Sequence, residues 1–112
     1  TDFGFLNLSD LNLAGPSAYL CPSHNPTSLP EVNSLSVNNC TGTLDTAIYR
    51  ENRFNAHIES MEGAAFFKFL NLRQAQGIQI RSISNIASAR NTDTWNIPLA
   101  LKKLKAELCK LT

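Results

Sequence analysis

The sequence is poor in charge. Asp, Glu, Lys and Arg make up 17% of the 112 residues, and the formal net charge is only +1. Domains that bind nucleic acid usually gather Lys and Arg into a strongly basic patch, because the phosphate backbone supplies much of the affinity. We therefore expect no nucleic-acid partner.

Long apolar runs are also absent. No uninterrupted stretch approaches the roughly 20 apolar residues that cross a bilayer as a helix, so we expect no membrane partner. The content of hydrophobic residues is nevertheless 43%, and internal repeats and low-complexity tracts are absent. A chain of this length and composition fits one globular domain.

Cysteine is scarce and irregularly spaced. The three cysteines, Cys21, Cys40 and Cys109, form an odd number, and no charged and apolar leader precedes them. This pattern predicts free thiols in a reducing cytoplasm. A zinc site that used Cys21 and His24 would need further ligands close by, and the other cysteines lie far away in the sequence, so we expect no metal.

The hydrophobic pattern predicts alternating strands and helices. Apolar and polar residues alternate over 34–39, as in a strand with one solvated face, and residues 55–59 and 77–84 are interpreted as a buried strand and a further strand. Helices are predicted over 44–53, 61–72 and from about Asn96 onward. This order is typical of an α/β sheet covered by helices. Residues 14–33 contain four of the five prolines together with several Gly, Ser and Asn residues, which predicts a long surface loop.

The two later helices differ in pattern. Residues 61–72 are apolar nearly all round, which predicts a helix that is buried on most of its surface. The last helix should begin near Asn96, because Pro98 is tolerated only in a first turn. Leucines and one isoleucine mark a single face of this last helix: Ile97, Leu101, Leu104, Leu108 and Leu111.

Two polar side chains follow predicted strands. Glu62 comes after the strand ending at Glu59, and Asn85 comes directly after the strand over 77–84. Open α/β sheets bind ligands at the carboxyl ends of their strands. We therefore expect Glu62 and Asn85 to converge on one ligand.

These residues lie in motifs that are similar to those of a known superfamily. The segment SMEGAAFF, then IRSISN and then TWNIPLALKKL resemble the carboxyl-terminal half of the purine nucleosidases and phosphorylases, most closely the futalosine hydrolases. The methylthioadenosine/adenosylhomocysteine nucleosidases are more distant. The likeness is tight from about Asn55 to Leu104 and loose from Thr1 to about Val32.

The resemblance implies a fold that is larger than this chain. It predicts part of a three-layer αβα nucleoside phosphorylase-like fold with a mixed central sheet, of which residues 1–112 are the carboxyl-terminal portion. Members of the superfamily activate water or bind phosphate with a carboxylate and Gly-rich turns in their amino-terminal half. We therefore expect this chain to carry the ribose and leaving-group side and to be inactive alone.

The resemblance also assigns roles near Glu62. In the superfamily, the corresponding glutamate accepts hydrogen bonds from ribose hydroxyls, and the methionine before it packs on the sugar. Met61 and Glu62, with Ser60 beside them, are therefore expected to bind substrate. Spacing alone favours plainer roles, a helix-capping carboxylate and a core methionine.

Asn85 is expected to act on the purine. The methylthioadenosine relatives carry an aspartate here, whereas an amide NH2 group donates to the O6 and N7 acceptors of a 6-oxopurine. Asn85 would then stabilise the departing base as a catalytic residue. Its plainer role is to close a turn after a strand.

The roles of the other candidate residues are less well defined by the sequence. The segment 40–45 resembles the loop that stacks on the purine, but it lacks an aromatic residue, so Thr43 is its only assigned substrate contact. His57 and Trp95 are interpreted as structural. Arg81 either orders a carboxylate or forms a partly buried structural ion pair.

The sequence therefore predicts a futalosine hydrolase-like nucleosidase that cleaves a 6-oxopurine nucleoside in menaquinone biosynthesis. It would use no cofactor and would form a homo-oligomer. One alternative is a methylthioadenosine/adenosylhomocysteine nucleosidase or a purine nucleoside phosphorylase. Another, of a different class, is a non-catalytic purine-binding or dimerisation module.

Overall fold

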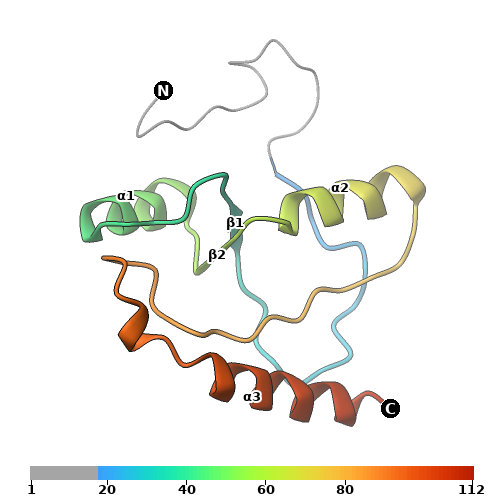
Figure 1. Ribbon diagram of the computed structural model, residues 1–112. Helices are drawn as coiled ribbons and strands as arrows, with labels where there is room; N and C mark the ends of the chain where they lie inside the picture. Colours follow the sequence, from blue (N-terminus) through green and yellow to red (C-terminus); the bar gives the residue numbers. More distant parts are fainter. Residues whose placement is uncertain (1–17) are drawn as a thin grey trace.

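The computed structural model describes residues 18–112, which contain helices and a small parallel sheet (Figure 1). The elements follow one another along the chain as β1 (Ser34–Ser36), α1 (Leu44–Phe54), β2 (Ile58–Ser60), α2 (Gly63–Arg73), the short 3-10 helix η2 (Thr92–Thr94) and α3 (Ile97–Lys110). The two strands lie at the centre, between α1 and α2. An extended segment separates them from α3, which runs along the far side.

The strands pair in parallel through a crossover that contains α1. Ser34, Leu35 and Ser36 are in register with Ile58, Glu59 and Ser60. Parallel strands need such a long connection, usually a helix, because a hairpin turn cannot join them. Both strands are shorter than the strands predicted over 34–39 and 55–59.

The second strand starts later than predicted because Asn55 belongs to the end of α1. Asn55 has φ 49°, in the left-handed region, and serves as the C-cap of α1. A residue in that conformation turns the chain and cannot begin an extended strand. The pairing continues by one bond beyond the first strand, where the amide of Val37 donates to the carbonyl of Ser60 at 2.8 Å.

Helix α1 agrees with its prediction over 44–53. The hydroxyl of Thr43 accepts from the amide of Thr46 and caps the first turn, where Asp45 also complements the helix dipole. Arg53 lies in the last turn, near the negative end of the dipole. Local signals therefore define this helix at both ends.

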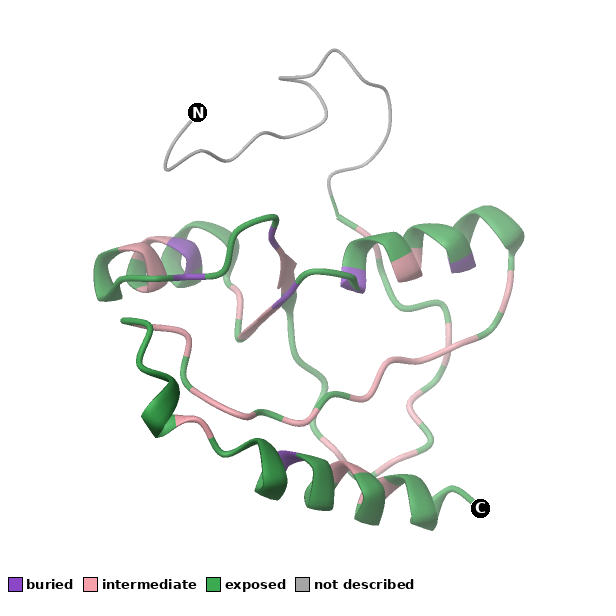
Figure 2. Cartoon of the chain, viewed as in Figure 1, coloured by how far each residue is buried: buried purple, intermediate pink, exposed green. Residues whose placement is uncertain are grey.

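Helix α2 begins two residues later than predicted and is far less buried than its composition suggested. Only Gly63 and Leu70 of this helix are buried, while Phe69 and Leu72 are exposed (Figure 2). The prediction of a helix covered on most of its surface is wrong for the described chain. A helix that is apolar on all sides is usually buried, but burial also requires neighbouring elements that cover it. In the described chain such elements cover little of α2.

The predicted strand over 77–84 does not form. The segment is extended, but its first backbone groups bond to side chains of the preceding loop, since Gly77 N donates to Ser23 Oγ at 2.7 Å and Cys21 Sγ donates to the Gly77 carbonyl at 3.4 Å. Further along, the Ser84 carbonyl accepts from the amide of Asn96. The described residues are thus α/β with a two-stranded parallel sheet, and do not form three layers around a mixed sheet.

Helix α3 begins where predicted. Asn96 is its N-cap and accepts from the amide of Leu99 at 3.1 Å, and Pro98 lies in the first turn. Its face toward the rest of the chain contains buried Ala100 and half-buried Leu104, but Leu101 is 62% exposed. The predicted apolar stripe is therefore only partly covered.

Little of the described chain is deeply buried. Val37, Leu70 and Ala100 are the buried apolar residues among residues 18–112. Residues 18–33 contain neither helix nor strand, and positions 14–17 of the predicted loop lie outside the described residues. None of the described helices has the length and apolar character that a membrane crossing requires.

Candidate functional site

The carboxyl ends of β1 and β2 meet the start of α2. Ser36 and Ser60, the last residues of the two strands, are register partners. The Ser36 hydroxyl accepts from the amide of Ala64 at 2.7 Å, and the Ser60 hydroxyl accepts from the amide of Gly63 at 3.3 Å. Both strand ends therefore satisfy amide groups that have no partner within the first turn of the helix.

Gly63 allows this edge to pack closely. A Cβ atom at this position would lie 3.1 Å from Ser60 Oγ, 3.3 Å from Gln79 Oε1 and 3.4 Å from Ser36 Oγ. These distances bring the extended segment around Gln79 directly against the start of α2. Glycine therefore favours this close approach, because any larger side chain would require these groups to shift. Its φ is not in the left-handed region, so the backbone conformation does not explain the glycine.

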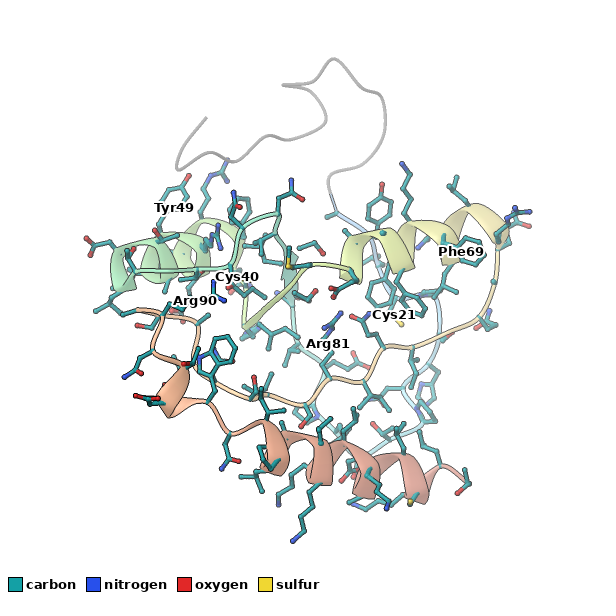
Figure 3. All side chains as sticks on the ribbon, in the orientation of Figure 1. Cys21, Cys40, Tyr49, Phe69, Arg81 and Arg90 are labelled. Carbon is teal, nitrogen blue, oxygen red and sulfur yellow. The ribbon has the colours of Figure 1, made fainter. Side chains whose placement is uncertain are left out.

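An ion pair joins the extended segment to the residue before α2. Arg81 Nη2 donates to Glu62 Oε2 at 3.1 Å, and Arg81 Nε donates to Gln79 Oε1 at 2.9 Å. Figure 3 shows Arg81 between the extended segment and the start of α2. Glu62 occupies the N-cap position, but its side chain makes no capping hydrogen bond. The carboxylate is 70% exposed, and Arg81 is its ion-pair partner.

The other residues of the predicted ribose site differ in exposure. Ser60 is buried at 8%, whereas Met61 is 53% exposed, so the methionine is not part of the core. Ser60, the last residue of β2, together with Met61 and Glu62 connects the strand to α2, and this segment is called the turn 60–62. The carboxylate and the thioether are exposed on it.

Asn85 does not end a strand, contrary to prediction, because residues 77–84 form none. Its side chain is engaged locally: Oδ1 accepts from Ser84 Oγ at 2.7 Å, and Nδ2 donates to the Ile86 carbonyl at 3.3 Å. No hydrogen bond of the described residues joins Asn85 to the turn 60–62. Arg81, four positions earlier in the same segment, makes the connection to Glu62 instead.

A shallow hollow lies beside this segment. It has a volume of about 400 Å³ and extends between residues 79–84 and α3. Polar groups come from the segment and apolar ones mainly from the helix: Gln79, Ile80, Arg81, Ser82, Ser84, Ile97, Ala100, Leu101 and Leu104. The hollow is open to solvent, and neither Glu62 nor Asn85 lines it.

Thr43 and His57 have structural roles. Thr43 is the N-cap of α1, where its hydroxyl accepts from the amide and contacts the hydroxyl of Thr46. His57 Nδ1 accepts from the amide of Asn33 at 3.0 Å, which ties the start of β2 to the start of β1. The structural interpretation of His57 agrees with this contact.

Trp95 and the cysteines add no chemistry to the site. Trp95 is half-buried before α3, and the guanidinium of Arg90 lies 6.0 Å from its ring centre. The three cysteines are free and exposed. Within residues 18–112, no group of three His, Cys, Asp or Glu side chains is placed to hold a metal ion.

Sequence reasoning missed a buried polar cluster next to this edge. Arg50 Nη1 donates to Thr41 Oγ1 at 2.8 Å and to Glu59 Oε2 at 3.0 Å. Glu59 also accepts from Thr41, at Oε1 from the amide and at Oε2 from the hydroxyl. The sequence did show Glu59 in a predicted strand and Arg50 in a predicted helix. Neither residue type nor spacing indicates that these two side chains pair with each other.

Comparisons with known proteins give no match. No family model matches the chain, and no curated protein and no solved structure is significantly similar to it. The interpretation of the site therefore rests on its geometry and on the motifs of the sequence.

Proposed function

We propose that this chain supplies the ribose- and base-binding half of a futalosine hydrolase-like nucleosidase. The enzyme would hydrolyse the N-glycosidic bond of a 6-oxopurine nucleoside in menaquinone biosynthesis. The observation that carries the proposal is the state of Glu62. Its carboxylate follows the carboxyl end of β2, is exposed, makes no capping bond and forms an ion pair with Arg81.

This state suits ribose binding. The oxygens of a helix-capping carboxylate accept hydrogen bonds from backbone amides. Glu62 makes no such bond, so its oxygens can accept hydrogen bonds from hydroxyl groups. Cleavage of the glycosidic bond builds positive charge on the ribose, and a fixed carboxylate stabilises that charge more strongly in the transition state than in the bound substrate. Met61, exposed in the same turn, would pack on the sugar.

Asn85 would serve the departing base. Negative charge develops on the purine as the bond breaks, and an amide NH2 group can donate to its N7 or O6 atom. Nδ2 of Asn85 presently donates to the Ile86 carbonyl at 3.3 Å, and Ser84 holds Oδ1 at 2.7 Å. When the base binds, Asn85 Nδ2 would donate to the purine instead of to the Ile86 carbonyl. The bond from Ser84 to Oδ1 would keep the amide oriented.

The proposal includes a larger assembly. The nucleophile, a water molecule, would be activated by groups in the other half of a three-layer αβα fold with a mixed sheet, and the enzyme would work in the cytoplasm as a homo-oligomer without a cofactor. Phosphate in place of water would make it a phosphorylase. Thr43 is the N-cap of α1 and the last residue of the loop 38–43, and in this proposal it would make a minor contact with the base.

A dimerisation module is the second candidate, favoured by the exposed leucines of α3. Leu101 and Leu108 are 62% and 47% exposed and line an apolar hollow of about 400 Å³ along the helix. Such a surface fits a protein contact better than a nucleoside.

An assay of hypoxanthine release separates these candidates. The complete protein that contains this sequence should release hypoxanthine from futalosine or inosine, and the 112-residue chain alone should not, because a positioned nucleophile contributes up to about 7–11 kcal/mol. Absence of release by the complete protein would contradict the proposal. Release by the isolated chain at a similar rate would refute its division into halves.

A further inference from the structure

The buried cluster of Thr41, Arg50 and Glu59 lies outside the proposed ligand contacts. Thr41 and Arg50 are 7% and 8% exposed. Charge-assisted hydrogen bonds of this kind are short and directional, and they hold their partners in one geometry. The cluster is therefore suited to fixing the position of the backbone around it.

The cluster connects three elements through one carboxylate. Glu59 is the penultimate residue of β2 and directly precedes the turn 60–62 that presents Glu62. Thr41 belongs to the loop 38–43, which leaves the carboxyl end of β1 and leads into α1, and Arg50 lies within α1. Both oxygens of Glu59 accept from Thr41, at 2.8 Å from its amide and 2.6 Å from its hydroxyl.

We propose that Glu59 is a positioning residue that sets the loop 38–43 relative to the turn 60–62. This inference rests on the proposed function, in which the loop lies on the base side and the turn on the ribose side of one nucleoside. Glu59 touches neither part of the ligand. Glu59 fixes the spacing between the loop 38–43 and the turn 60–62. Its loss should therefore weaken binding of a nucleoside, which contacts both elements, more than binding of a free base, which contacts only the loop.

The test compares two ligands on matched variants. Thr41→Val removes two hydrogen bonds of the hydroxyl, one to Glu59 and one from Arg50, but keeps the amide bond to Glu59. Thr41→Ser keeps the hydroxyl, and Glu51→Gln removes an exposed carboxylate of α1. Affinities for inosine and for free hypoxanthine are measured by NMR titration at a temperature where circular dichroism shows every variant folded. A displaced loop that fails to make one hydrogen bond to the bound nucleoside corresponds to about tenfold in affinity.

The expected pattern is specific to positioning. Thr41→Val should weaken inosine binding by about tenfold and hypoxanthine binding by less than about twofold, with Thr41→Ser and Glu51→Gln close to the original protein. An unchanged inosine affinity in folded Thr41→Val would overturn the inference. So would an equal loss for both ligands, which indicates local damage.

Two further measurements keep the inference testable. If Thr41→Val does not fold, Glu59→Asp replaces it, since this change keeps the charge but withdraws the carboxylate by one methylene, and the same pattern is expected. If the original protein binds neither ligand, the proposed function fails. In that case, the backbone amide resonances of the ligand-free protein test whether the cluster positions the turn 60–62. Thr41→Val should shift the resonances of residues 60–62, and unchanged resonances would overturn the inference.

Discussion

Arg81 and Glu62, which are 19 positions apart, form an ion pair of 3.1 Å that joins the extended segment to the turn before α2. The side chains are 30% and 70% exposed, so the pair contributes little to stability, about 1 kcal/mol at most. Its consequence is the orientation of the carboxylate that we assign to ribose.

Replacement of Arg81 should therefore separate binding from stability. Arg81→Gln is expected to weaken inosine binding several-fold, because Glu62 loses the group that orients it, and to leave the free energy of unfolding within about 1 kcal/mol. Calorimetric titration and urea unfolding measure the two quantities. Lys103→Gln, which removes the same charge from an exposed position of α3, is the control. Equal effects of the two changes would show that only net charge matters.

Gly63→Ala should destabilise the protein although alanine favours helices. The added Cβ would lie 3.1 Å from Ser60 Oγ and 3.4 Å from Ser36 Oγ, and both hydroxyls already hold amides of α2. Displacing them should cost about 1–2 kcal/mol in the free energy of unfolding, more than the propensity gain of alanine at a helix start.

Gly42→Ala is the matched control, because no atom lies within 4 Å of the position that its added methyl group would take and its φ is not in the left-handed region. It should be neutral or slightly stabilising, since alanine restricts the unfolded chain. Chemical unfolding of the two variants checks the contrast. A Gly63→Ala protein as stable as Gly42→Ala would mean that the edge is not tightly packed.

The exposed face of α3 should mediate self-association at micromolar concentration. Leu101 and Leu108 border the apolar hollow along this helix, and water-exposed apolar patches of this kind mark protein contacts. The double change Leu101→Gln with Leu108→Gln should convert the assembly to a monomer in sedimentation experiments. Lys103→Gln, on the opposite side of the helix, should not. A compact monomer of the original chain would refute this prediction.

Local signals in the sequence predicted the helices well. The boundaries of α1 and α3 depend on neighbouring residues, such as Asn96 and Pro98 at the start of α3, and both helices begin where expected. The α/β class follows from the same order of elements. These features could be predicted because caps and periodicity act within a few residues.

Long-range pairings could not be predicted in the same way. The strand pattern over 77–84 gives an extended segment, but a strand also needs a neighbouring strand. In the described chain, Ser23 and Cys21 bond to the backbone groups of Gly77 instead. The burial predicted for α2 likewise depends on partners that the pattern does not specify. The same holds for Arg50 and Glu59, whose pairing joins a helix to a strand.

The candidate site was predicted in part. Glu62 lies at the carboxyl end of a strand, as expected, but Asn85 does not, and Arg81 rather than Asn85 contacts Glu62. The sequence left Arg81 between two roles, ordering a carboxylate or forming a partly buried structural ion pair, and its contact with Glu62 at 3.1 Å is compatible with both. The contribution of Asn85 to base recognition stays a prediction.

Asn85→Asp should change the choice of base. An asparagine amide donates to the N7 and O6 atoms of hypoxanthine, while adenine presents a donor at its 6-position and leaves one buried group unpaired, which costs about 1–3 kcal/mol. Hypoxanthine nucleosides should therefore be preferred by roughly tenfold to a hundredfold, and Asn85→Asp should shift the preference toward adenine. The ratio of inosine to adenosine affinities measures this, and an unchanged ratio would remove Asn85 from the base site.

The central claim is that Glu62 binds ribose, and the most direct test is a titration of the chain with inosine. Glu62→Gln keeps the size and the position of the side chain but removes its charge and part of its accepting capacity. The affinity of the original protein should exceed that of Glu62→Gln by about tenfold or more, with amide shifts centred on residues 60–63, while Glu51→Gln should bind normally. Equal binding by Glu62→Gln and the original chain, or no binding by either, would contradict the claim.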